Sequence, residues 1–170
     1  MSLLTLYLLR HAKSAWDDPK LADFDRPLAP RGEREAADMA ALIAARAYRP
    51  ERVLCSNARR TRETLGAVLK ALPAETSIEI TRRLYEADAE SLLNILYEQR
   101  GAASIMLIGH NPGLHQLAQF LAGAGDGKTL HRLRTDFPPA SLAMIEFTAE
   151  SWSDVRPGAG RLLALDTPSR

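Results

Sequence analysis

The stretch Leu3-Leu4-Thr5-Leu6-Tyr7-Leu8-Leu9-Arg10-His11 is a nearly continuous apolar run that ends in an arginine and a histidine. The pattern returns later in the chain, where Ile105-Met106-Leu107-Ile108 is followed by Gly109 and His110. Short apolar runs of this kind are typical of strands buried on both faces of a sheet. If the two strands are neighbours in a parallel sheet, both imidazoles meet at its carboxyl edge, where open α/β sheets bind ligands.

Strand-like and helix-like patterns alternate along the rest of the chain. Short apolar runs predict further strands over residues 52–55, 77–80, 104–108, 140–148 and 161–166. The run at 77–80 is more polar and is expected nearer an edge of the sheet. Such alternation indicates a mostly parallel sheet with helices on both faces. We therefore expect residues 1–170 to form a single domain, a three-layer α/β/α sandwich.

Four helices are predicted between these strands. The first begins at Arg31, and the third runs from residue 88 or 89 to residue 99. The fourth takes Asn111 as its N-cap and Pro112 as its first residue, both favoured in those places. The second ends before Pro73 and carries four apolar side chains on one face, Leu65, Val68, Leu69 and Leu72.

Two long segments are predicted to be loops, residues 15–30 and residues 123–139. We interpret the acidic residues of the first as solvated charge, with a substrate-selecting rim as the alternative; they are Asp17, Asp18, Asp23 and Asp25. We interpret the basic residues of the second in the same way, with a patch for an acidic protein partner as the alternative. They are Lys128, His131, Arg132 and Arg134.

Composition narrows the classes of function. The chain has 170 residues, with 22 Lys and Arg against 21 Asp and Glu, a formal net charge of +1. A general nucleic-acid binder needs a strongly basic face, so no nucleic-acid partner is expected. No apolar stretch is long enough for a membrane span, and the N-terminus lacks the features of a signal peptide. We expect a cytoplasmic protein without a membrane partner.

The metal-ligating residue types do not form a recognisable site. Cys55 is the only cysteine, and we interpret it as a small buried hydrophobe. A cysteine phosphatase needs five residues between Cys and Arg, whereas four lie between Cys55 and Arg60. His110 and His115 are five positions apart and do not share a helix face for zinc. No aspartate cluster at the strand ends suggests Mg²⁺, so neither a metal nor another cofactor is expected.

Polar residues gather instead where predicted strands end. The first strand delivers Arg10 and His11, the second delivers Ser56 and Arg60, and His110 follows the strand at 104–108. Two histidines and two arginines suit a phosphoryl group, because one imidazole can attack phosphorus while the cations hold its oxygens.

These residues resemble the motifs of the histidine phosphatase superfamily, which contains the phosphoglycerate mutases. Arg10-His11-Ala12 is similar to its Arg-His-Gly signature, with alanine in place of the usual glycine. Residues 56–64 resemble its Ser-x-x-x-Arg-x-x-x-Thr segment, which aligns Arg60 rather than Arg59 with the second phosphate-binding arginine. Residues 28–32 resemble the turn before its first helix, and Gly109-His110 matches its second histidine.

The resemblance implies a phosphoglycerate mutase-like fold and a two-step, metal-independent reaction. Neutral His11 attacks phosphorus to give a phosphohistidine enzyme, which water then hydrolyses. Arg10, Arg60 and protonated His110 bind the phosphoryl charge, so the pKa values of the two histidines are expected to be pushed apart. Ser14 and Asn57 are expected to add hydrogen bonds to the phosphoryl oxygens. The catalytic acid is expected at Glu86, with Asp88 as the alternative.

The short chain, which lacks inserted subdomains, resembles the small SixA-type phosphohistidine phosphatases rather than the mutases. The resemblance implies that the substrate is phosphohistidine in a protein, with a histidine-containing phosphotransfer domain as one such partner. A phosphoramidate also makes less demand on a positioned acid than an alkyl phosphate does. A small-molecule phosphomonoester is the alternative substrate. A non-catalytic phosphate-binding domain on the same fold is the second alternative.

Overall fold

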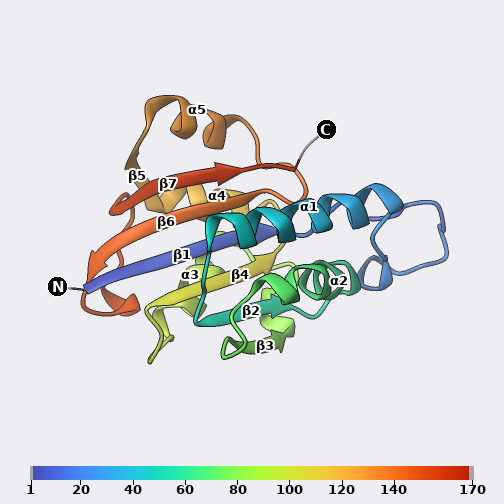
Figure 1. Cartoon of the computed structure of the whole chain (residues 1–170), viewed down its shortest axis with the longest axis horizontal. Coiled ribbons are helices and arrows are strands. Elements are labelled where there is room, and N and C mark those ends of the chain that lie inside the picture. The colour runs from blue at the N-terminus through green and yellow to red at the C-terminus, as the bar shows by residue number, and fades with distance from the viewer. Residues whose placement is uncertain (1, 169–170) are drawn as a thin grey trace.

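A seven-stranded sheet runs through the middle of the molecule in the computed structural model, which describes residues 2–168 (Figure 1). The strands are β1 (Ser2–Arg10), β2 (Arg52–Ser56), β3 (Ser77–Thr81), β4 (Ser104–Gly109), β5 (Ala122–Gly125), β6 (Leu142–Ala149) and β7 (Gly160–Asp166). Their order is β3-β2-β4-β1-β6-β7-β5, so the polar strand β3 lies at an edge as predicted. Only β6 runs antiparallel to its neighbours β1 and β7, and the sheet is therefore mostly parallel.

Helices cover both faces of this sheet. They are α1 (Pro30–Arg46), α2 (Arg59–Val68), α3 (Ala89–Tyr97), α4 (Gly113–Leu121) and α5 (Gly127–Thr135). α1 and α2 pack together on the face turned to the viewer in Figure 1, and α3 and α4 pack together behind the sheet. This is the three-layer α/β/α arrangement predicted from the alternation of elements. No helix within residues 2–168 is long and apolar enough to cross a membrane.

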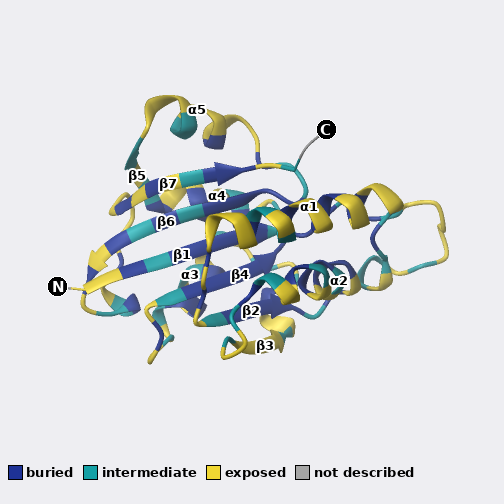
Figure 2. Cartoon of the chain, viewed as in Figure 1, coloured by how far each residue is buried: buried dark blue, intermediate teal, exposed yellow. Residues whose placement is uncertain are grey.

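Strand β1 divides the core between these two layers. Successive side chains of a strand point to opposite faces. Leu6 and Leu8 accordingly belong to the cluster beneath α3 and α4, whereas Tyr7 and Leu9 belong to the cluster beneath α1 and α2. The central strands are buried along most of their length (Figure 2). Full burial of such a side chain contributes about 1.5–3 kcal/mol each, which explains why this run is apolar on both faces.

The register between β1 and β4 sets the position of the two strand-end histidines. The strands are parallel neighbours, and Arg10 pairs with Gly109 at their carboxyl ends. The His11 backbone N–H continues the pairing by donating to the Gly109 carbonyl at 3.1 Å. His11 and His110 therefore leave neighbouring strands at the same level, as the sequence predicts.

The segment 123–139 is not the loop that its composition predicts. It contains β5, which pairs with β7, and the helix α5. Asp126 caps α5 by accepting a hydrogen bond from the Thr129 backbone N–H at 3.0 Å. Leu133 of α5 is buried in the core, so tertiary packing outweighs the polar composition of this helix.

Two details of the predicted helices are wrong. α4 begins at Gly113 rather than Pro112, after a cis Asn111–Pro112 peptide bond. Asn111 does not cap the helix, because its side-chain amide donates instead to the Phe137 carbonyl at 2.9 Å. In the second helix Leu69 is 46% exposed, because α2 ends at Val68 and a 3₁₀ turn, Leu69–Ala71, rotates this side chain away from the core.

Candidate active site

The two strand-end histidines form the centre of the site. His11 follows β1 and His110 follows β4, and their ring centroids lie 5.3 Å apart. Both residues are buried, with 7% and 8% of their surfaces exposed. A separation of this size leaves the rings close enough to act on one small group.

The backbone fixes the proton of His11 on one ring nitrogen. Nδ1 lies 2.7 Å from the carbonyl oxygen of Ala12. A carbonyl can only accept, so Nδ1 carries the proton and donates it. Nε2 then holds the lone pair, which is the requirement for a nucleophilic imidazole.

Thr64 of α2 binds the backbone of Ala12, whose carbonyl fixes the tautomer of His11. Its Oγ1 accepts a hydrogen bond from the Ala12 backbone N–H at 3.0 Å and donates to the Arg60 carbonyl at 2.8 Å. Thr64 is fully buried. One hydroxyl therefore connects the backbone beside His11 to the helix that carries Arg60.

His110 makes hydrogen bonds through both ring nitrogens. Nδ1 lies 3.3 Å from Nη2 of Arg60, and Nε2 lies 2.7 Å from Oγ of Ser56, the last residue of β2. A guanidinium can only donate, so Nδ1 of His110 is the acceptor and the ring proton sits on Nε2. In this arrangement His110 is a neutral imidazole.

Both histidines have lowered pKa values, although the hydrogen bond to the Ala12 carbonyl acts to raise the pKa of His11. Burial, helped by the charges of Arg60 and Arg10, lowers the pKa of His11 to about 3. Burial and the Arg60 charge lower the pKa of His110 to about 4, although Asp23 opposes the shift. The expectation that the two values are pushed apart is wrong, because the same burial and the same arginines act on both rings. A phosphoryl dianion bound between the rings would add to the effect of Asp23 and favour a protonated His110.

Asp23, in the loop before α1, holds the Arg60 side chain from two directions. Nη1 of Arg60 donates to the Asp23 backbone carbonyl at 2.8 Å, and Nη2 donates to the Asp23 carboxylate at 3.1 Å. The same carboxylate oxygen accepts from the Tyr85 hydroxyl at 2.7 Å. Tyr85 also lies edge-on to the His110 ring, with centroids 5.5 Å apart. The loop before α1 therefore lies against the side of the site that contains Arg60.

Arg10 lies on the opposite side of the site, against the segment before β6. Its Nη1 donates to the Phe137 carbonyl at 3.1 Å, whereas its buried Nε has no hydrogen-bond partner in the protein. Burial lowers the pKa of Arg10 from its ordinary high value, with Asp136 opposing. A buried guanidinium with an unpaired N–H suits an anionic ligand, because leaving such a donor unpaired is costly.

The remaining predicted residues have less central positions. Ser14 is buried and pairs through its backbone with Leu28, which closes the loop between them. Asn57 follows Ser56, and its Oδ1 is buried without a partner. Glu86 is exposed and has a left-handed backbone with φ of 57°.

Asp88, the alternative acid, is a helix cap. Its carboxylate accepts a hydrogen bond from the Ser91 backbone N–H at 2.8 Å at the start of α3. The hydrogen bonds from Ser91 hold the pKa of Asp88 below its usual range. An ionised cap is poorly suited to donate a proton, which argues against Asp88 as the catalytic acid.

Sequence reasoning missed the parts played by Asp23, Tyr85 and Thr64. Asp23 could not be separated from the other aspartates of its loop, because the contact with Arg60 spans 37 positions of sequence. Thr64 did carry a signal, since it closes the Ser-x-x-x-Arg-x-x-x-Thr segment. Cys55, by contrast, behaves as predicted: it is fully buried, and burial raises its pKa to about 12.

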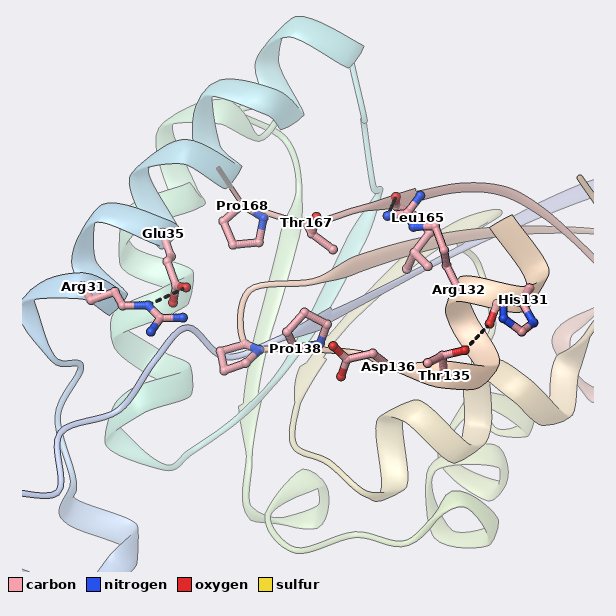
Figure 3. Close-up of a pocket in the computed structure, with 11 residues that line it drawn as sticks. Arg31, Glu35, His131, Arg132, Thr135, Asp136, Pro138, Leu165, Thr167 and Pro168 are labelled. Atoms are coloured by element: carbon pink, nitrogen blue, oxygen red, sulfur yellow. Dashed lines mark hydrogen bonds and ion pairs between the residues drawn. The ribbon is translucent and has the colours of Figure 1, made fainter. Parts of the chain in front are cut away.

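A cavity of about 340 Å³ lies between the start of α1, the helix α5 and the end of β7 (Figure 3). Glu35, one of its walls, also accepts a hydrogen bond from the Lys13 backbone, two residues after His11. Pro138 and Pro139 form another wall, next to the carbonyl that binds Arg10. Within residues 2–168, no cluster of three or more His, Cys, Asp or Glu side chains is placed to hold a metal ion.

A mostly parallel α/β sheet with paired histidines and arginines at its carboxyl edge defines a site for phosphoryl groups. The family model that matches residues 6–102 is the histidine phosphatase superfamily, branch 1. The chain therefore belongs to the histidine phosphatase superfamily. Three of the four site residues, Arg10, His11 and Arg60, lie within the matched range, and His110 lies beyond it.

Curated relatives align with this chain over nearly its whole length, and they are themselves described as uncharacterized. An uncharacterized chloroplastic protein of Arabidopsis thaliana is 33% identical over 96% of this chain and 77% of its own. An uncharacterized protein of Mycobacterium tuberculosis is 34% identical over 94% of this chain and 99% of its own.

Among solved structures, SixA proteins are similar to this chain in fold and in sequence. A candidate phosphohistidine phosphatase SixA of Agrobacterium tumefaciens has 34% identity and a TM-score of 0.81, covering 98% of this chain and 99% of its own. The protein histidine phosphatase SixA in complex with tungstate has 25% identity and a TM-score of 0.72, with 97% of each chain covered. The fold is thus that of SixA and the phosphoglycerate mutase-like proteins, and these similarities support phosphatase chemistry.

Proposed function

We propose that the protein is a phosphatase that passes the phosphoryl group through His11. The observation that carries the proposal is the tautomer of His11, whose Nδ1 is bound to the Ala12 carbonyl and whose Nε2 is left as the nucleophile. Its low pKa keeps this lone pair available at neutral pH. Membership of the histidine phosphatase superfamily supports the same assignment.

The reaction has two displacement steps. In the first, the Nε2 lone pair of His11 forms a bond to phosphorus while the bond from phosphorus to the leaving group breaks, and that electron pair stays on the leaving atom. In the second, a water oxygen attacks phosphorus and the phosphorus–nitrogen bond to His11 breaks. Its electron pair returns to Nε2, and the released phosphate keeps the two water protons. Arg10 and Arg60 hold the equatorial oxygens, where the transition-state charge collects. No metal or organic cofactor takes part in these steps.

The proposed substrate is phosphohistidine displayed on a protein, such as a histidine-containing phosphotransfer domain. Transfer from one imidazole to another exchanges one phosphorus–nitrogen bond for another, so it makes little demand on a general acid. The site offers no obvious acid, because His110 is neutral, Asp88 is a helix cap and Glu86 is exposed. The SixA relatives support this choice of substrate.

The test compares initial rates of the purified protein on a phosphohistidine protein, an aryl phosphate and a panel of sugar phosphates. The proposal predicts that kcat/KM is higher on the phosphohistidine protein by at least about 100-fold. Glu86→Gln should change that rate little. A much higher kcat/KM on one small phosphoester, with strict dependence on Glu86, would favour a metabolite phosphatase. Absence of turnover together with phosphate binding would favour a non-catalytic binding domain.

A further inference from the structure

The Asp23 carboxylate binds Arg60 beside the proposed phosphoryl site, where a negative charge is unfavourable for binding an anion. A site for a phosphoryl dianion gains affinity from cations, and a nearby anion opposes binding. Yet the Asp23 carboxylate lies 3.1 Å from Nη2 of Arg60, whose side chain is only 9% exposed. The same Nη2 lies 3.3 Å from Nδ1 of His110. Asp23 therefore acts on the two groups that face the phosphoryl group.

The position of Asp23 is itself fixed by several contacts. It begins a 3₁₀ turn, Asp23–Asp25, in which Phe24 packs edge-on against Tyr85 with centroids 5.2 Å apart. Its second carboxylate oxygen lies 4.0 Å from Nε of Arg26. The end of the loop is tied to α2, because Glu63 accepts a hydrogen bond from the Leu28 backbone N–H at 2.8 Å. These contacts restrict Asp23, so that it can in turn restrict the side chain of Arg60.

Tyr85 donates to the same carboxylate oxygen of Asp23 that accepts from Arg60. Burial and the Asp23 charge raise the pKa of Tyr85 to about 12, so its hydroxyl keeps the proton that it donates to Asp23. Burial works to raise the pKa of Asp23, but the hydrogen bonds from Tyr85 and Arg60 and the Arg60 charge outweigh it and keep the pKa below its usual range. The carboxylate is ionised at neutral pH and accepts from both partners at once.

We propose that Asp23 is a positioning residue that holds the Arg60 guanidinium in the orientation required by the phosphoryl group. The inference rests on the proposed phosphatase function, since it deepens the role of Arg60 in that site. Asp23 does not touch the substrate. Its backbone carbonyl and carboxylate fix two of the three guanidinium nitrogens, so that Arg60 needs no reorganisation when the reaction begins.

The test uses the full chain with Asp23→Asn, and with Asp25→Asn as the matched control because Asp25 is exposed in the same loop. The amide keeps the shape of the side chain but removes the charge that aligns Arg60. Positioning predicts a fall in kcat of about 10- to 100-fold and weaker binding of orthophosphate. Removal of a repelling anion alone would instead tighten orthophosphate binding. Free energies of unfolding, measured with urea, identify any variant that fails to fold.

A double-mutant cycle shows whether Asp23 acts through Arg60. In the background of Arg60→Ala, Asp23→Asn should cause no further loss of kcat or of orthophosphate affinity. The same loss in both backgrounds, or tighter orthophosphate binding and undiminished kcat in Asp23→Asn, would overturn the proposal. Orthophosphate binding, measured by calorimetry, reads the position of Arg60 without turnover. If the wild-type protein lacks turnover, the proposed function fails while the cycle in binding still tests Asp23.

Discussion

Arg59 and Arg60 are neighbours in sequence with different surroundings, and they provide a matched pair of variants. Arg60 is buried between Asp23 and His110, whereas Arg59 is half-exposed and pairs with Glu63 one helical turn away. Arg60→Lys replaces a planar fork with a point charge and should lower kcat/KM by about 100-fold or more. Arg59→Ala should remain within about twofold of wild type, because exposed ion pairs contribute little.

Steady-state kinetics on a phosphohistidine protein measures both variants. The reverse outcome, with Arg59 essential and Arg60 dispensable, would show that Arg60 does not bind the phosphoryl group.

The lowered pKa values of His11 and His110 predict how stability depends on pH. In the folded protein His110 stays neutral down to about pH 4, and His11 stays neutral down to about pH 3. An unfolded histidine takes up a proton near pH 6.5. Their contribution to stability is therefore present above about pH 6.5 and is lost as the pH falls toward the folded values. Below about pH 6, each residue adds up to about 1.4 kcal/mol per pH unit to the fall in the free energy of unfolding.

Urea denaturation at a series of pH values between about 7.5 and 5 measures this slope. His110→Gln should make the slope shallower, because it removes one of the two buried histidines that take up a proton only on unfolding. An unchanged slope in His110→Gln would mean that His110 titrates alike in the folded and unfolded chains.

At this scale the sequence predicts residues that follow strands, because a parallel sheet must bring its carboxyl ends together. Arg10, His11, Arg60 and His110 are found together for that reason. The hydrogen bonds that set the histidine tautomers come from a neighbouring carbonyl and a distant arginine, so no local pattern reveals them. Asp23 reaches the site only because its loop folds back, which is a property of tertiary structure.

Among the elements, the start of α1 depends on a glycine. A Cβ atom on Gly32 would lie 2.0 Å from the carbonyl oxygen of Lys13, which itself accepts a hydrogen bond from Ala29. Gly32→Ala must push the helix away from the backbone that follows His11. We expect a loss of about 1–3 kcal/mol in the free energy of unfolding and a lower kcat.

Gly66→Ala is the matched control for this helix start. Gly66 lies in α2 with no atom within 4 Å of a Cβ built on it, so alanine should stabilise the protein by up to about 1 kcal/mol. Thermal and urea denaturation distinguish the two variants. A neutral Gly32→Ala would contradict the close contact between α1 and the segment after His11.

Helices and strands with a clear apolar pattern are predicted well from the sequence. Elements that are defined by a few tertiary contacts are not. β1 and β4 are buried on both faces, so their runs are unmistakable. β5, with the sequence Ala-Gly-Ala-Gly, has almost no side chains to carry a strand signal and is defined by its pairing with β7. Gly113, where α4 begins, lies against the Ala87 carbonyl, a contact between distant segments that no local pattern reveals.

For the molecule as a whole, the positive charge at the site comes from its own side chains. In the proposed reaction Arg10 and Arg60 supply the charge stabilisation that divalent ions supply in a metal phosphatase. We expect turnover to stay within about twofold of its original value after exhaustive dialysis against a chelator. Loss of activity that returns only with a divalent cation would contradict an arginine-based site.

The central claim for the whole molecule is that the phosphoryl group passes through His11. Rapid quenching of a reaction in base, followed by mass spectrometry of peptides, measures this directly, because phosphohistidine survives base but not acid. We expect a phosphoryl group on His11 during turnover, and neither phosphorylated His11 peptide nor turnover in His11→Asn with its fold intact. Label on Cys55, Ser56 or His110, or turnover that persists in His11→Asn, would contradict it.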